Sequence, residues 1–366
     1  MFVRNAWYCA GWDYEVTQAK DSLVPRRIAG ERLVLYRRLD GRVVAFDDRC
    51  PHRQAALSLG RKEGNTLRCM YHGLRFDSNG QCVEVPGQNH VPHNACARVY
   101  PVVEKDNWIW VWMGDPAKAD PDLIPFAVGP SEPGWNIKTS KMHVKTNYRL
   151  EIANLADLSH ISWVHENTVG GSLKYTESTP QYELAPRALK TKFWVRSCAA
   201  AGAAKHLFPA DALFDICFDI THTIPCTWVL RYRMFTAGTR TEGESNGNLI
   251  LDTWSSQAVT PCDEDSVDYY YSWGASRETD FPGASDMLRE AVDVAFREDA
   301  VMLEAQHVRM KERPDLKLLD IRLDTGPGKI LWVLDRLLKQ EAQEVHQEND
   351  RADARPALAG IELARG

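Results

Sequence analysis

Two cysteine–histidine pairs in the first quarter of the chain constrain its fold more than any other feature. Cys50 and His52 are separated by one residue, Cys69 and His72 by two, and 16 residues lie between the pairs. Each pair adjoins a predicted strand, so we expect the pairs at the tips of two loops, with a metal between them. Zinc would bind all four side chains as one tetrahedral site. A [2Fe–2S] cluster would take two thiolates on one iron and two imidazoles on the other. The spacing alone leaves both possibilities open.

The region around these pairs reads as all-β. Short β-type runs are broken by turn signals such as Asp40-Gly41, whose residues supply the positive φ angles of a tight hairpin turn. Two predicted hairpins and an aromatic strand occupy residues 32–46, 74–85 and 108–113. The stretch 114–134 is rich in Pro, Gly and Asp and predicts a linker. We therefore expect an all-β N-terminal domain, linker included, over residues 1–135.

The rest of the chain mixes strands and helices, so the predicted fold class is α+β. The predicted elements are strands at 227–235 and 267–273, a long helix at 284–313, and a last helix from about Lys329. We expect a second domain over residues 136–345. Residues 346–366 are polar and are expected to form a loose tail.

Composition excludes several classes of protein. The formal net charge is −6 and no run of Lys and Arg stands out, which argues against a nucleic-acid-binding surface. No apolar stretch approaches the roughly 20 residues that cross a bilayer, and the N-terminus lacks the apolar core of a secretion signal. Nine cysteines in such a chain favour metal binding over disulfides. We expect a cytoplasmic protein with no membrane or nucleic-acid partner.

A second group of polar residues lies at 154–165, which reads as a helix. Asn154, Asp157 and His160 recur every three residues, so neighbouring members share a face. His160 and His165 are about 140° out of phase on a regular helix. They can reach one metal only if a turn widens or the helix ends between them. Two histidines and one carboxylate with open positions are the ligands of non-haem Fe(II) enzymes that activate oxygen.

Asp299 is the candidate for the third ligand. It lies in phase with an apolar stripe on the predicted helix 284–313, and a carboxylate that faces a core is costly unless it pairs with a cation or a metal. The stripe comprises Leu288, Val292, Ala295, Met302 and Leu303. Glu298 lies near a weaker apolar stripe, so phase prefers Asp299 only modestly. Hydrogen-bonded core histidines and a solvated carboxylate would also fit these residues.

The motifs Cys-Pro-His-Arg and Cys-Met-Tyr-His-Gly-Leu, which begin at Cys50 and Cys69, resemble the paired motif of Rieske domains. Pro86-Gly87-Gln88 resembles the proline loop that shields the cluster in those domains. The order of cluster motif, Asn/Asp/His/His segment and late acidic residue is similar to that of Rieske non-haem iron oxygenase catalytic subunits over nearly the whole chain. The N-terminus and the strand near Trp110 resemble the shorter monooxygenase branch, which includes vanillate O-demethylases, toluenesulfonate methyl-monooxygenases and dicamba O-demethylases.

This resemblance implies a Rieske β-domain followed by a helix-grip α+β catalytic domain. It implies that the [2Fe–2S] cluster is held by Cys50, His52, Cys69 and His72. It also implies that a mononuclear Fe(II) is held by His160, His165 and Asp299. Asp157 and Asn154 would be catalytic residues beside the iron. The Asp157 carboxylate would orient His160 and link it to the cluster of a neighbouring subunit in a head-to-tail homotrimer.

The activity implied is that of a terminal oxygenase component, which would use O2 to oxidise a methyl or methoxy group of a small, acidic aromatic compound. The chain has no Gly-rich dinucleotide motif, so an NAD(P)H-dependent flavin and iron–sulfur reductase would supply the electrons. Arg231 and Arg233 alternate with Tyr232 and could bind an anion if their face lines the pocket. A solvent-facing position fits the pattern equally well. The alternatives are ring dihydroxylation, a non-catalytic Rieske electron carrier and a zinc-stabilised structural protein.

Overall fold

Strands dominate the first third of the chain, as predicted. The computed structural model describes all residues except 21, 171, 240–246 and 354–366. A three-stranded sheet has the order β1-β11-β10, and two four-stranded sheets have the orders β2-β3-β4-β9 and β5-β6-β7-β8. Their bounds are β1 Trp7–Trp12, β2 Val24–Ile28, β3 Glu31–Arg37, β4 Val43–Asp47, β5 Arg61–Glu63, β6 Thr66–Arg68, β7 Arg75–Phe76, β8 Cys82–Glu84, β9 Val99–Tyr100, β10 Val102–Lys105 and β11 Trp108–Trp112. Both predicted hairpins and the aromatic strand are confirmed.

The second part is built on one antiparallel sheet of seven strands, in the order β12-β18-β17-β16-β15-β14-β13. These strands are β12 Trp135–Val144, β13 Gln181–Leu184, β14 Ala188–Cys198, β15 Phe214–Thr223, β16 Thr227–Thr236, β17 Leu249–Pro261 and β18 Val267–Ser276. The predicted strands at 227–235 and 267–273 are confirmed. Because β12 begins at Trp135, the sheet starts at the predicted boundary, although the domain limits themselves stay a prediction.

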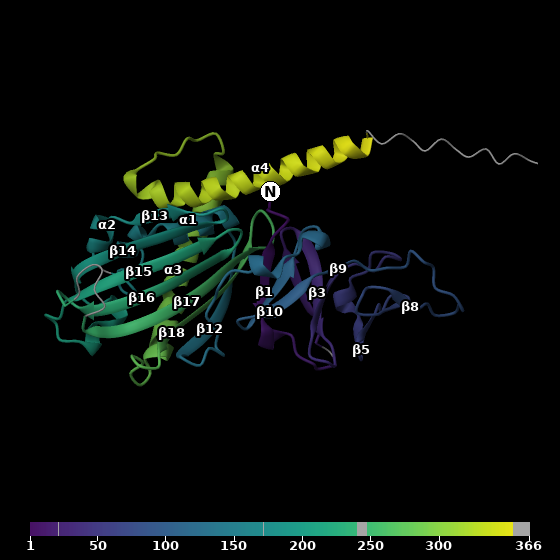
Figure 1. Ribbon diagram of the computed structural model, residues 1–366, viewed down its shortest axis with the longest axis horizontal. Coiled ribbons are helices and arrows are strands. Elements are labelled where there is room, and N and C mark those ends of the chain that lie inside the picture. Colours follow the sequence, from purple (N-terminus) through teal and green to yellow (C-terminus); the bar gives the residue numbers. More distant parts are fainter. Residues whose placement is uncertain (21, 171, 240–246, 354–366) are drawn as a thin grey trace, which may run out of the picture.

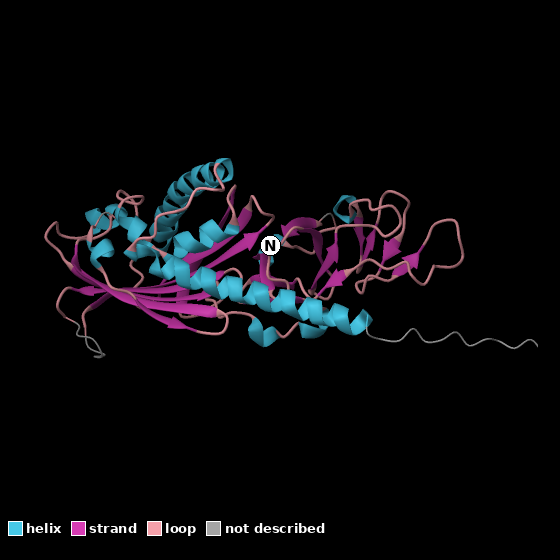
Figure 2. Ribbon diagram, turned by 90° about the horizontal axis from the view of Figure 1, so that it is seen from above, coloured by secondary structure: helices cyan, strands magenta, loops and turns pink. Residues whose placement is uncertain are grey.

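Helices lie against this sheet and beside it (Figures 1 and 2). The α-helices are α1 Tyr148–Ala156, α2 Lys174–Glu177, α3 Ala284–Glu312 and α4 Thr325–Asp353. Helix α3 packs on β12 and β18, and α4 packs on α1 and β14. Short 3-10 helices occur at Asp13–Glu15, Leu57–Leu59, Pro116–Lys118, Pro121–Leu123, Leu158–Ser162, Gly202–Leu207 and Arg322–Asp324. No helix in the described ranges is long and apolar enough to cross a membrane.

Two details of the predicted helices were wrong. Met302 was placed on the core stripe of α3 but is 58% exposed, because it lies one position, or about 100°, from the buried Leu303. Residues 346–353, predicted to be loose, continue helix α4, which ends at Asp353. The remaining tail residues, 354–366, lie outside the described part of the chain.

Aromatic packing fills the core of the N-terminal part. Every residue of β11 is buried, and the Trp112 and Trp108 rings meet Trp7 and Trp12 of β1 edge-on at 5.4 and 5.2 Å between ring centroids. Such pairs stabilise a core beyond the area that they bury. Strand β11 therefore anchors β1 near the N-terminus. The two cysteine loops lie near β5 and β8, at the end of the N-terminal part that is remote from the seven-stranded sheet (Figure 1).

Candidate metal centres

The two cysteine loops have the same backbone hydrogen-bond pattern. The Cys50 N–H donates to the Ala55 carbonyl and the Cys69 N–H to the Leu74 carbonyl, both at 2.8 Å. In each loop the cysteine carbonyl accepts from the N–H four residues later, at 2.8 and 2.9 Å. Both thiols are buried. The two loops therefore have the same backbone conformation, and each offers one buried thiol as a ligand.

The four predicted cluster ligands divide into an inner and an outer pair. Burial, with the Cys69 thiol beside it, raises the pKa of the Cys50 thiol to about 11. The His52 and His72 rings are exposed and lie 4.6 Å apart, edge to face. Among the described residues no three of these four donors lie within 4.8 Å of one another. A tetrahedral zinc ion would need all four donors at its own short bonding distances. A [2Fe–2S] cluster needs a thiolate pair and a separate imidazole pair, and this donor set fits it.

The loop predicted to shield this site lies against it. Gly73 follows His72 with a φ of 79°, and a Cβ added there would come within 2.7 Å of the Pro86 ring. Only glycine combines this backbone angle with so close an approach. The Pro86 loop therefore packs on the second cysteine loop.

The segment with the predicted iron ligands is not one helix, and that prediction was wrong. Helix α1 ends at Ala156 because Asp157 has an extended backbone, with φ −116° and ψ 99°. The Asp157 carboxylate accepts from the Ser159 N–H at 2.8 Å and begins the 3-10 helix Leu158–Ser162. This helix ends between His160 and His165, which is the alternative that lets both reach one point.

The structure brings the three predicted iron ligands together. His160 Nε2 lies 3.5 Å from Asp299 Oδ1, and His165 Nε2 lies 3.2 Å from Asp299 Oδ2. The three donor atoms all lie within 4.8 Å of one another. Asp299 is 4% exposed, and the Asn154 amide donates to its Oδ1 at 3.1 Å. The chemistry and spacing of these donors fit a mononuclear Fe(II) with open positions. Their roles as ligands stay a prediction.

Hydrogen bonds hold both imidazoles with Nε2 toward this point. His160 Nδ1 is bonded to the main-chain carbonyl of Asp157, and His165 Nδ1 lies 2.8 Å from Glu298 Oε2. Thr168 Oγ1 donates to the same Glu298 oxygen at 2.9 Å. Burial opposes the charged form of His165, but the bonds from its two ring nitrogens to Asp299 and Glu298 raise its pKa overall. In His160 the carbonyl oxygen only accepts, so Nδ1 carries the proton and Nε2 keeps its lone pair for a metal. Burial lowers the pKa of His160, which favours this neutral form.

Two carboxylates thus have contacts that differ from those expected. Glu298, the weaker candidate for a ligand, orients His165. The Asp157 carboxylate caps Ser159, while its main-chain carbonyl orients His160. The contact between Glu298 and His165 could have been predicted, because Glu298 is adjacent to Asp299 and a metal-binding imidazole needs a hydrogen-bond acceptor at its other ring nitrogen. The position of Thr168 offered no such indication.

A cavity of about 130 Å³ opens beside the three donors, between α3 and the sheet. Trp228, Leu230, Tyr232 and Met234 line it from β16. Side chains alternate along a strand, so Arg231 and Arg233 point to the opposite face. Arg231 is held there by Asp252, through bonds of 3.0 and 2.7 Å. The condition for these arginines to bind an anion in the pocket is therefore not met, and the alternative, a position on the other face of the sheet, is the one observed.

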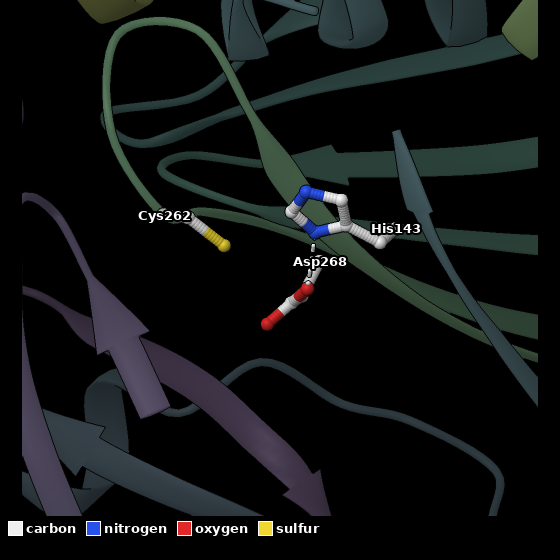
Figure 3. A group of neighbouring side chains, drawn as sticks. All are labelled: His143, Cys262 and Asp268. Carbon is white, nitrogen blue, oxygen red and sulfur yellow. Dashed lines mark hydrogen bonds and ion pairs between the residues drawn. The ribbon is translucent and has the colours of Figure 1, made fainter. Parts of the chain in front are cut away.

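A second group of possible metal donors comprises His143, Cys262 and Asp268 (Figure 3). His143 on β12 and Asp268 on β18 are cross-strand partners, with Nδ1 2.8 Å from Oδ1. Burial, followed by the Asp268 charge, raises the pKa of the Cys262 thiol to about 12. His143 is exposed, and none of the three lines the cavity. The buried group beside the cavity is therefore the better candidate for the iron.

Comparisons with known proteins identify both parts of the chain. Residues 6–99 match the Rieske [2Fe-2S] domain, and residues 144–340 match the vanillate O-demethylase oxygenase C-terminal domain. The toluene-4-sulfonate monooxygenase system iron-sulfur subunit of Comamonas testosteroni is 36% identical, over 93% of this chain and 98% of that protein. The vanillate O-demethylase oxygenase subunit of Pseudomonas sp. (strain HR199 / DSM 7063) is 31% identical, over 94% and 97%. The crystal structure of dicamba monooxygenase bound to dicamba superposes with a TM-score of 0.83 at 30% identity, over 93% and 99% of the two chains.

The fold and these relatives define a Rieske-type monooxygenase component, an oxidoreductase that depends on a separate reductase. Its cofactors are a [2Fe–2S] cluster and a mononuclear non-haem iron. Within that class, the chain belongs to the vanillate O-demethylase oxygenase family.

Proposed function

We propose that this protein oxidises a methyl or methoxy group of a small aromatic compound, with His160, His165 and Asp299 as its iron ligands. The observation that carries this proposal is the convergence of these three donors, of which His165 and Asp299 are buried, at the wall of an apolar cavity. When bound there, Fe(II) would supply the activation of O2 for insertion into a C–H bond. Cys50, His52, Cys69 and His72 would hold the cluster that passes on electrons. Their division into two buried thiols and a neighbouring pair of exposed imidazoles supports this assignment.

The chain's own groups position both iron and substrate. Asn154 holds one Asp299 oxygen, and Glu298 holds His165, so the donors are fixed before a substrate enters. The apolar lining excludes water and places the target carbon near the donors. Overall, the C–H bond becomes C–OH, and O2 with two electrons and two protons yields one water as the second product. A hydroxylated methoxy group then releases formaldehyde and leaves a phenol.

The relatives support the reaction class, since their names refer to toluene-4-sulfonate and vanillate and the solved structure contains dicamba. We propose that the electron donor is an NAD(P)H-dependent flavin and iron–sulfur reductase. We further propose a cytoplasmic homotrimer, in which one subunit's cluster faces the next subunit's iron. The domain limits proposed are residues 1–135 and 136–345, with residues 346–366 beyond the catalytic domain.

Metal analysis of anaerobically purified protein tests this proposal. We expect three irons and two acid-labile sulfides per chain and a Rieske-type EPR signal after reduction. His160→Ala should lose one iron and keep both sulfides. His143→Ala, which alters the other donor group, should keep all three irons. Zinc without sulfide would contradict the proposal, and two irons in the unaltered protein would favour an electron carrier.

A further inference from the structure

We propose that the substrate is an uncharged aromatic molecule, and that the hydroxyls of Tyr175 and Tyr232 bind a neutral hydrogen-bond acceptor on it. This inference rests on the proposed oxygenase function and names its substrate class. It replaces the acidic substrate that the sequence led us to expect.

The first observation is the charge of the cavity. Apart from the candidate iron ligands His160, His165 and Asp299, none of the described residues that line the cavity is acidic, basic or a histidine. The arginines nearest along β16 lie on the other face of the sheet. A carboxylate or sulfonate in this cavity would lose its hydration and meet no side-chain cation, which makes its binding costly. A neutral ring loses little on entering.

The second observation is the pair of unused phenol groups. The Tyr175 hydroxyl makes no hydrogen bond within the described chain, and the Tyr232 hydroxyl contacts only the sulfur of Met234 at 3.7 Å, a weak acceptor. Burial raises the pKa of both tyrosines, so both keep their protons and remain donors. Tyr175 on α2 and Tyr232 on β16 both line the cavity. A neutral oxygen acceptor on the substrate would satisfy them.

The Gln257 and Trp273 side chains of the lining already have partners. Gln257 donates to Ser255 Oγ at 2.9 Å and accepts from the Tyr269 hydroxyl. The Trp273 indole N–H donates to Thr253 Oγ1 at 3.0 Å. The Trp228 indole N–H and the Asn154 amide oxygen are buried without a partner in the described part of the chain, so the free side-chain hydrogen-bonding groups of the lining are these two and the two phenols.

The third observation is the aromatic wall formed by Tyr175, Phe218 and Tyr232. Phe218 meets Tyr175 and Tyr232 edge to face, at 5.9 and 5.3 Å between ring centroids. Phe193 stacks face to face on Phe218, at 4.7 Å between ring centroids, and holds that ring in place. Aromatic rings prefer such edge and offset contacts, so this wall suits a planar aromatic ligand whose acceptor reaches the two hydroxyls.

A matched pair of ligands tests the charge preference. 4-Methoxybenzamide and 4-methoxybenzoate have nearly the same shape and differ in charge. Their dissociation constants would be measured by calorimetry on the iron-loaded full chain, without O2 or reductant. We expect the amide to bind about 100-fold more tightly than the carboxylate, because only the carboxylate loses ionic hydration. Equal or tighter binding of the carboxylate, or binding of neither compound, would overturn the inference.

Tyr175→Phe tests the hydroxyl at almost constant shape. We expect it to weaken binding of the amide about 10-fold and to leave 4-methylanisole, which lacks the amide, unaffected. Tyr148→Phe is the matched control, because its hydroxyl donates to the Met1 carbonyl instead. Unchanged amide binding by Tyr175→Phe would overturn the role of this hydroxyl. Tight amide binding without formaldehyde release, once reductase and O2 are added, would support the substrate class and count against the oxygenase function.

Discussion

Asp157 combines a structural role with a proposed electronic one. Its carboxylate caps the Ser159 N–H, and its carbonyl holds His160. Since asparagine caps helices as well as aspartate does, Asp157→Asn should keep the turn and both metals. We expect turnover to fall at least about 10-fold, because the change removes the charge proposed to link His160 to the neighbouring subunit's cluster. Metal content and the rate of substrate-dependent O2 uptake measure this. Near-normal turnover would rule out the link.

Glu151 makes the stability of the protein depend on pH. It is 2% exposed, and its Oε2 has no partner in the described chain. Burial, and then the Asp299 charge, raises its pKa from 4.5 to about 8. Between these values the folded protein binds more protons than the unfolded one, so the free energy of unfolding falls as pH rises, by up to about 1.4 kcal/mol per pH unit. Below pH 4.5 this loss is absent.

Glu151→Gln should therefore raise the apparent melting temperature more at pH 8 than at pH 5. Since the amide stays neutral at both values, the pH-dependent cost of burying the charge disappears. Thermal unfolding of the iron-loaded protein at the two pH values measures the difference. Glu183→Gln, at an exposed residue of β13, is the control and should change neither. An equal shift at both pH values would contradict the assignment.

At the level of elements, the sequence predicted those helices and strands whose formation depends on residues within one segment. The hairpins, β16 and α3 follow from alternation, turn residues and helical spacing within one segment. The segment 154–165 misled because Asn154, Asp157 and His160 recur every three residues, which is also the period of the 3-10 helix that follows the break. The C-terminal end of α4 is polar and lacks apolar periodicity, so the sequence did not predict that the helix continues there. Tyr175 and Tyr232 lie far apart in the sequence and line one cavity only because of the fold, so this could not be predicted.

Gly170 closes the turn that carries the second histidine. Its N–H donates to the His165 carbonyl at 3.0 Å, and a Cβ added to it would lie 2.0 Å from the Ile161 carbonyl oxygen. Gly170→Ala must therefore displace the segment between His160 and His165. We expect Fe(II) affinity to fall at least about 10-fold, with the Rieske EPR signal unchanged. Gly134→Ala, where an added Cβ meets nothing within 4 Å, is the control. Unchanged iron affinity would show that the ligands tolerate the shift.

At the scale of the whole molecule, the two parts are joined firmly. Helix α4 runs along both (Figures 1 and 2), and Glu341 on it accepts from the Asn5 N–H at 2.6 Å. Lys118 pairs with Glu344 at 3.0 Å, and the Trp12 indole donates to the Ser140 carbonyl at 3.1 Å. The cysteine loops nevertheless lie near the free end of the N-terminal part, away from the seven-stranded sheet that borders the iron donors. Because these contacts fix the two parts relative to each other, the cysteine loops stay apart from the iron donors of the same chain. This separation favours electron delivery from a neighbouring chain.

Mixed oligomers test this arrangement. Cys69→Ala chains would lack the cluster and His160→Ala chains the iron, so each is expected to be inactive alone. In a head-to-tail trimer of both, an intact cluster can face an intact iron across a subunit contact. In every mixed ring of three chains, about one contact in three places an intact cluster before an intact iron. We therefore expect co-expressed trimers that carry both tags to recover about a third of the unaltered activity per chain, measured as O2 uptake. If electrons passed only within a chain, no mixed trimer would be active, because no chain would hold both metal centres.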